Sequence, residues 1–171
     1  MNERIFQCIS IYFNIFLLVI TNMISIRKAR PEDAQVIIDF QQKMAWETEM
    51  MTLETDIVTK GVNAVFNNNV LGQYWVAEAD GQVVASMLIT YEWSDWRNAI
   101  VWWFQSVYVL PSHRRSGIFR SMYMHIRNEA ERTGVAGLRL YVETNNTGAH
   151  KTYEALGMKR EHYAMYEWMK E

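Results

Sequence analysis

The residues best suited to chemistry form a short turn, Arg114-Arg115-Ser116-Gly117, between an apolar segment and an amphipathic one. Gly117 tolerates backbone conformations that other residues resist, so consecutive N–H groups of the turn can point at one anion. A helix that begins here adds the positive end of its dipole. With two arginines alongside, these donors predict a site for a phosphorylated ligand.

The turn differs from two familiar nucleotide-binding loops. No Gly-Lys-Ser/Thr is present, so a P-loop and its Mg²⁺ ligand are not indicated. The three-glycine spacing of a dinucleotide-binding fingerprint is absent as well. A strand-to-helix turn with solvated arginines has the same local sequence, so the turn alone leaves a purely structural interpretation open.

The elements that must position this turn follow from periodicity and turn signals. Asp80-Gly81 indicates a tight hairpin, and the segment 99–110 is apolar on both faces, as a central strand should be. Strands are expected at residues 24–29, 73–79, 82–91, 99–110, 138–143 and 161–169, and helices at 30–46, 52–66, 117–132 and 146–155. This order predicts a single-domain, three-layer α/β (α+β) fold, with a mixed central sheet of about six strands flanked by about four helices.

Composition narrows the functional classes. Half of the 171 residues are hydrophobic, and the net charge is −2, which argues against a large nucleic-acid footprint. The single cysteine, Cys8, cannot form an intramolecular disulfide. The four histidines show no i, i+4 pair, so no metal is expected.

Residues 1–22 form an apolar N-terminal extension. The apolar stretch 5–20 is shorter than the roughly 20 residues that span a bilayer, and it is interrupted by polar residues. Three interpretations stay open: a segment that packs on the domain or on a second chain, a weak membrane anchor, or an over-called start. Met23 begins a clean domain pattern of its own, so the domain is placed at residues 23–171.

A second motif strengthens the interpretation of the turn as a ligand site. It reads Asn146-x-x-Ala149-x-x-x-Tyr153, followed by Gly157-Met158. Combined with Arg114-x-x-Gly117-x-Phe119 after a strand that ends in Val-Leu-Pro, it resembles the GCN5-related N-acetyltransferase (GNAT) superfamily. The resemblance covers residues 23 to about 169. Phe119 stands where the family has a small residue, and Met158 where it has an aromatic one.

The resemblance implies the acyl-CoA N-acyltransferase fold and acetyl-CoA as acyl donor, with no metal. Backbone groups of the central strand would pair with the pantetheine arm like an added strand, and N–H groups of the turn would hold the pyrophosphate. Tyr153 would be the general acid for the leaving thiolate. The implied donor-binding residues are Val107, Tyr108, Val109, Arg114, Arg115, Ser116, Gly117, Ile118, Phe119, Arg120 and Asn146.

The general base has several candidates. Alternation along the central strand places Trp103, Gln105, Val107 and Val109 on the face toward the pocket, and Gln105 cannot act as a base. Glu143 and Glu92 are the acidic candidates, although each is more often a solvated surface charge in such a position. A water chain to bulk solvent is equally suitable.

The resemblance implies that the substrate side is built from the first two helices and nearby loops. Acidic and aromatic residues together favour a cationic amine through charge pairing and cation–π contact. The candidate substrate-binding residues are Trp46, Glu47, Trp93, Trp96 and Gln105.

The sequence therefore predicts a cytoplasmic N-acetyltransferase that moves an acetyl group from acetyl-CoA to a primary amine of a small molecule or peptide. Transfer is expected to be direct, in a ternary complex, because the only cysteine lies outside the domain. The alternative is a non-catalytic acyl-CoA-binding or regulatory module on the same fold. A homodimer is expected, while nucleic acid and membrane are not expected as partners. The sequence does not identify the amine.

Overall fold

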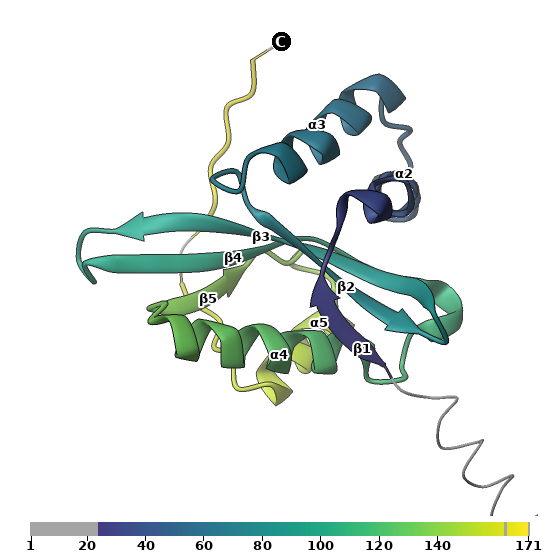
Figure 1. Cartoon of the computed structure of the whole chain (residues 1–171). Coiled ribbons are helices and arrows are strands. Elements are labelled where there is room, and N and C mark those ends of the chain that lie inside the picture. The colour runs from purple at the N-terminus through teal and green to yellow at the C-terminus, as the bar shows by residue number, and fades with distance from the viewer. Residues whose placement is uncertain (1–23, 163, 171) are drawn as a thin grey trace, which may run out of the picture. The chain divides into compact units, whose positions relative to one another are not determined.

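A computed structural model describes residues 24–162 and 164–170 of the chain. Internal contacts divide the chain into two units, residues 1–140 and 141–171, and each is described by itself. The first unit carries a five-stranded sheet in the order β1-β2-β3-β4-β5 (Figure 1). The strands are β1 (Ser25–Lys28), β2 (Gln73–Ala79), β3 (Gln82–Ser94), β4 (Ala99–Val109) and β5 (Gly137–Leu140). The first four pair antiparallel, and β5 runs parallel to β4, so the sheet is mixed as predicted.

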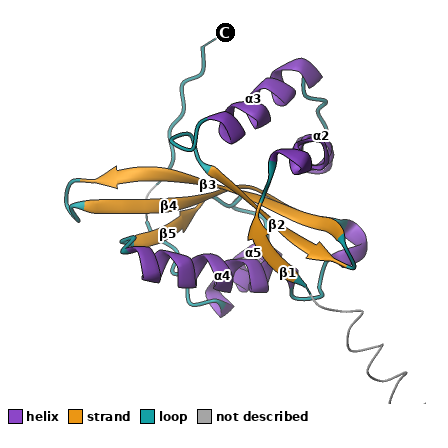
Figure 2. Cartoon of the chain, viewed as in Figure 1, coloured by secondary structure: helices purple, strands orange, loops and turns teal. Residues whose placement is uncertain are grey.

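Helices cover both faces of this sheet (Figure 2). The first unit holds the 3-10 turn η1 (Pro31–Asp33), the helices α2 (Ala34–Glu49), α3 (Thr55–Asn67) and α4 (Ile118–Thr133), and the 3-10 turn η2 (Pro111–His113). Tyr74 packs against Phe66 of α3, whereas its neighbour Trp75 packs against His125 of α4. Because successive strand residues point to opposite faces, α3 and α4 lie on opposite sides of the sheet. The three layers of the predicted α/β fold are confirmed.

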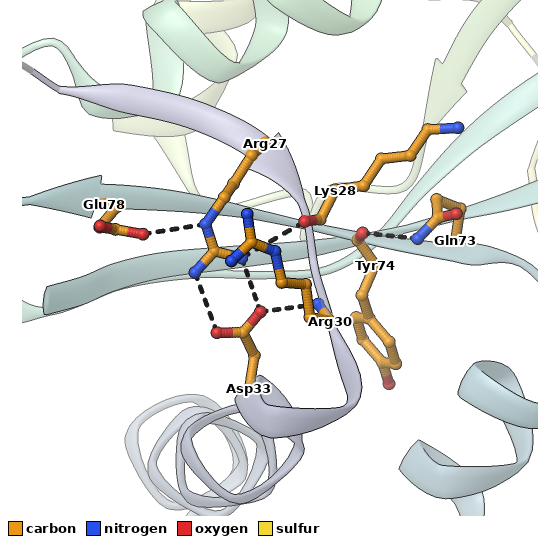
Figure 3. A network of polar contacts seen from close by, with 7 residues as sticks. All are labelled: Arg27, Lys28, Arg30, Asp33, Gln73, Tyr74 and Glu78. Carbon is orange, nitrogen blue, oxygen red and sulfur yellow. Dashed lines mark hydrogen bonds and ion pairs between the residues drawn. The ribbon is translucent and has the colours of Figure 1, made fainter. Parts of the chain in front are cut away.

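An ion network fixes the junction between β1 and α2 (Figure 3). Arg27 donates from both terminal nitrogens to the two carboxylate oxygens of Asp33, at 2.7 and 3.0 Å, and from Nε to Glu78 at 2.9 Å. The backbone N–H of Arg30 donates to Asp33 Oδ2 at 2.7 Å. The Arg27 hydrogen bond lowers the pKa of Asp33, against the opposing effect of burial. A buried carboxylate thus holds the first turn before α2 against β1 and β2.

The strand count differs from the prediction. The strand expected at 161–169 is wrong: residues 161–162 and 164–170 are described, and none of them is in a strand. Alternating apolar and polar residues can favour a strand, but a strand exists only where a neighbour supplies hydrogen bonds. β3 extends to Ser94, into the segment expected as a loop, because Ser94 pairs with Ala99.

The predicted extension 1–22 lies outside the described residues. Along the residues that are described, no helix is both long and apolar enough to cross a bilayer.

Candidate functional site

A bulge in β4 shapes the centre of the sheet. Gln105 lies opposite Leu88 and Tyr108 opposite Ser86, so β4 has one residue more than β3 between these pairs. Ser106 has a φ of +47°, in the left-handed region. The strict alternation predicted for residues 103, 105, 107 and 109 is therefore wrong. Gln105 and Tyr108 share one face, while Val109, opposite Ala85, lies on the other.

The C-terminal half of β4 has one free edge within the first unit. The pairing of β4 with β5 runs only from Val101 to Phe104, and within described residues 24–140 no strand follows it along Gln105–Val109. The N–H of Leu110 donates to Val84 O at 2.9 Å. This bond makes Val109 and Ala85 a non-hydrogen-bonded pair, so the backbone groups of Val109 point away from β3. An extended ligand could bind along this edge.

The Arg114 side chain lies at the end of this edge. Its Nε donates to Val109 O at 2.9 Å, and its Nη2 donates to Glu47 Oε2 at 2.5 Å. Its guanidinium carbon lies 5.4 Å from the centre of the Tyr108 ring, within cation–π range. Arg114 therefore connects the strand end to α2 instead of being simply solvated.

Glu47 accepts a second hydrogen bond from the hydroxyl of Tyr108, at 2.7 Å. The Tyr108 ring is buried and packs against Phe40 of α2 at 5.1 Å. Hydrogen bonds from Arg114 and then Tyr108 lower the pKa of Glu47. Burial, followed by the bond to Glu47, raises the pKa of Tyr108 to about 12. The structure thus joins residues for which the sequence predicted separate roles, and their 61- and 67-residue separations left no local signal.

The turn before α4 contains two residues in the left-handed region of the backbone. Arg115 and Gly117 have φ angles of +62° and +84°, and Gly117 immediately precedes Ile118, the first residue of α4. Ser116 Oγ donates to the carbonyl of His113. The first N–H groups of a helix have no intrahelical acceptor, so those at the start of α4 are suited to an anion. Phe119, in place of a small residue, packs its ring against Tyr123 of α4 at 6.5 Å.

Glu92 lies in β3, not in a loop. Its two carboxylate oxygens accept hydrogen bonds from Trp103 Nε1 and from Arg139 Nη1, at 2.5 and 2.8 Å. The Arg139 guanidinium also lies over the Trp103 ring at 5.6 Å. Glu92 therefore belongs to a cluster formed by β3, β4 and β5.

The predicted substrate residues are dispersed. Gln105 lies on the same face of β4 as Tyr108. Trp93 follows Glu92 directly in β3, so it lies on the opposite face of the sheet from Glu92 and Gln105. Trp46 on α2, Trp93, and Trp96 in the β3–β4 turn are all exposed. The strand register, which places Trp93 and Gln105 on opposite faces, could not be read from the residue types that suggested them.

The second unit contains α5 (Thr147–Ala155). Asn146 is its N-cap, and its Oδ1 accepts a hydrogen bond from the N–H of Ala149 at 3.0 Å. Tyr153 is half-buried, and burial raises its pKa. Glu143 is exposed, lies beyond the end of β5, and accepts a hydrogen bond from the N–H of Asn145 at 3.0 Å. The motif asparagine thus has a structural role in starting the helix that carries Tyr153.

Comparison with known proteins shows which proteins this chain resembles. The model of the acetyltransferase (GNAT) family matches residues 32–158. A solved structure of a possible acetyltransferase from Clostridium difficile 630 is 43% identical, covers 86% of this chain and 98% of its own, and has a TM-score of 0.80.

More distant structures share the fold. A predicted acetyltransferase with acetyl-CoA from Clostridium acetobutylicum is 21% identical, with a TM-score of 0.67 and coverage of 86% of this chain and 95% of its own. Aminoglycoside N-acetyltransferase AAC(6')-Iy in complex with CoA is 15% identical, with a TM-score of 0.72 and coverage of 87% and 96%. On the family match and the 43% identity, this chain belongs to the acetyltransferase (GNAT) family.

Proposed function

We propose that the protein is an acetyl-CoA-dependent N-acetyltransferase that transfers the acetyl group directly to a primary amine in a ternary complex. The observation that carries the proposal is the free edge of β4 at Gln105–Val109, which leads into the glycine turn at the start of α4. An extended thiol arm with a pyrophosphate at one end needs these two features in this order. Family membership supports the same reaction class.

The donor site is proposed along this path. Backbone groups of residues 107–109 would hold the pantetheine arm. The N–H groups of residues 115–120, which include the positive-φ residues of the turn, would hold the pyrophosphate. A side chain at Gly117 would meet no atom within 4 Å, so space remains on that side of the turn. Asn146 would contact the arm through its amide nitrogen, because its oxygen caps α5.

Acetyl-CoA supplies the acetyl group as a thioester. The amine nitrogen forms a bond to the acetyl carbon, the carbon–sulfur bond breaks, and the thiolate takes a proton. Tyr153 is proposed to donate that proton, because burial raises its pKa and keeps the phenol protonated near neutral pH. The amine proton leaves to Glu92, to Glu143 or to a water chain, and no contact selects among them.

The acceptor is proposed to be a cationic amine of a small molecule or peptide. Trp46 of α2, the helix that packs on the Tyr108 face of β4, exposes aromatic surface that a cation can contact. The AAC(6')-Iy neighbour is an aminoglycoside acetyltransferase, which supports including polyamine-like antibiotics among the amines tested. A cytoplasmic location and a homodimer stay predictions from the sequence.

The test is calorimetric titration of the full chain with acetyl-CoA, followed by a thiol-release screen against a panel of amines that includes aminoglycosides, polyamines and peptides. We expect micromolar binding with one site per chain, and turnover on at least one amine. Binding without turnover on any amine would favour the non-catalytic module. No binding would overturn the proposed donor site.

A further inference from the structure

We propose that Glu47 is a positioning residue of the donor site. Its carboxylate holds the Arg114 side chain against the end of β4, and through Arg114 it fixes the turn that precedes α4. The proposal rests on the proposed binding of acetyl-CoA. It gives Glu47 a different role from the amine recognition expected from the sequence.

The contacts of Glu47 argue against a free carboxylate for a substrate amine. Oε1 accepts from the buried Tyr108, and Oε2 accepts from Arg114. A cationic amine at Glu47 would have to compete with a guanidinium that is already held by a carbonyl and an aromatic ring. Arginine presents its donors in a rigid fork, so two bonds to different elements fix its orientation.

The contact between Glu47 and Arg114 matters for the donor site because of where Arg114 lies. The carbonyl of Val109 points to the free edge of β4, and Arg114 Nε occupies it there. Arg114 is also the first residue after η2, directly before the positive-φ residue Arg115. One side chain therefore joins the proposed pantetheine edge to the proposed pyrophosphate turn, and Glu47 holds that side chain from α2.

The same contacts indicate different roles for the arginines of the turn and of the start of α4. The charge of Arg114 is compensated by Glu47 at 2.5 Å. Arg115 and Arg120 are exposed on the turn and at the start of α4. In this arrangement the charges of Arg115 and Arg120 attract the phosphate groups, whereas Arg114 holds the strand end and the turn in position.

The distinguishing experiment compares Glu47→Gln with Glu131→Gln. Glu131 forms an exposed ion pair with Arg127 on α4, so its substitution also removes an arginine–glutamate pair. For each variant the dissociation constant of CoA is measured by calorimetry, and the KM for the amine is measured at saturating acetyl-CoA. We expect E47Q to weaken CoA binding by about fivefold or more, with the KM for the amine unchanged and no effect of E131Q on either.

Two results would overturn the positioning role. If E47Q raises the KM for the amine and leaves CoA affinity unchanged, Glu47 recognises the acceptor. If E47Q tightens CoA binding, Glu47 restrains an Arg114 that is itself a phosphate ligand. Failure of the wild-type protein to bind CoA would instead refute the proposed function, so the two failures are distinct.

A double-mutant cycle distinguishes an effect of Glu47 through Arg114 from a general loss of structure. If Glu47 acts through Arg114, the E47Q/R114Q double variant should bind CoA no more weakly than R114Q alone. Additive losses would overturn the proposal. Tyr108→Phe, which keeps the buried ring and removes only the hydroxyl donor, should reproduce part of the E47Q effect.

Discussion

Tyr153 is the residue on which the proposed proton transfer depends. Its phenol donates only while protonated, and burial raises its pKa above the ordinary value of 10.0. We expect Tyr153→Phe to lower kcat by about 10²-fold or more with CoA affinity unchanged, because general acid catalysis contributes that much. Steady-state kinetics with any amine identified in the screen, together with calorimetry, check this.

The pH profile provides the control. Because burial raises the pKa of Tyr153, the wild-type enzyme should keep the acid function to a higher pH than an ordinary tyrosine would, and Tyr153→Phe should lack the alkaline decline. Tyr166→Phe, at a tyrosine that is 96% exposed, should leave kcat as it is. A Tyr153→Phe enzyme with undiminished kcat would exclude Tyr153 as the acid.

For single residues, the sequence predicts those roles that depend only on neighbours along the chain. Gly117 lies at a positive-φ turn, and Asn146 begins a helix, as their motifs indicate. It could not predict that Glu47 contacts Arg114, because that contact joins residues 67 positions apart through tertiary packing. For the same reason, the sequence could not show that Trp93 and Gln105, both candidate substrate residues, lie on opposite faces of the sheet.

Among the elements, the turn before α4 depends on one glycine. Gly117 has a φ of +84°, and a Cβ there would meet no atom within 4 Å, so the cost of a side chain is backbone strain and not a clash. We expect Gly117→Ala to lower the free energy of unfolding by about 1–2 kcal/mol and to weaken CoA binding. Chemical denaturation and calorimetry measure the two effects.

Gly61, an exposed glycine within α3, is the matched control. It also has no atom within 4 Å of an added Cβ. Gly61→Ala should raise the free energy of unfolding by about 0.5–1 kcal/mol, because alanine favours a helix interior. Equal behaviour of the two variants would refute the conformational argument for Gly117.

The junction between β1 and α2 depends on Asp33. Asp33→Asn removes the carboxylate that accepts from Arg27 and Arg30, and should cost about 2–3 kcal/mol of unfolding free energy at pH 7. Because the folded-state pKa of Asp33 is lowered, this difference should be fully present above the unfolded pKa of about 3.9 and be lost progressively as the pH falls from there through the lower folded-state pKa. Denaturation of both proteins between pH 3 and pH 7 tests the sign.

Asp39→Asn is the control for that experiment, since Asp39 is exposed and accepts only from Gln35 among the hydrogen bonds described for it. It should change stability little at any pH. A stability gap for Asp33→Asn that persists unchanged into acid would mean that the charge of Asp33 contributes nothing.

Element prediction succeeded where the signal is local. Asp80-Gly81 connects β2 to β3, as the dipeptide indicates, and the helices begin close to their expected starts. It failed at residues 161–169, where the alternation of apolar residues says nothing about a pairing partner. It also missed the bulge at Ser106, because serine, unlike glycine, asparagine or aspartate, does not signal a positive φ.

For the molecule as a whole, family membership predicts a single measurable property: acetyl-CoA should bind the folded state and stabilise it. At a concentration about 100 times the dissociation constant, such binding adds about 2.7 kcal/mol. For a chain of 171 residues this corresponds to a rise in Tm of about 5–11 °C. Thermal unfolding of the full chain with increasing acetyl-CoA measures it.

The ligand series determines which part of the chain is responsible. Pantetheine lacks the pyrophosphate, so it can use the free edge of β4 but not the N–H groups before α4. It should therefore shift Tm far less than CoA at equal concentration, and the difference should shrink in Gly117→Ala, where the turn is strained. An equal shift from both ligands would locate the binding energy in the strand edge and refute the pyrophosphate site, while leaving the family assignment intact.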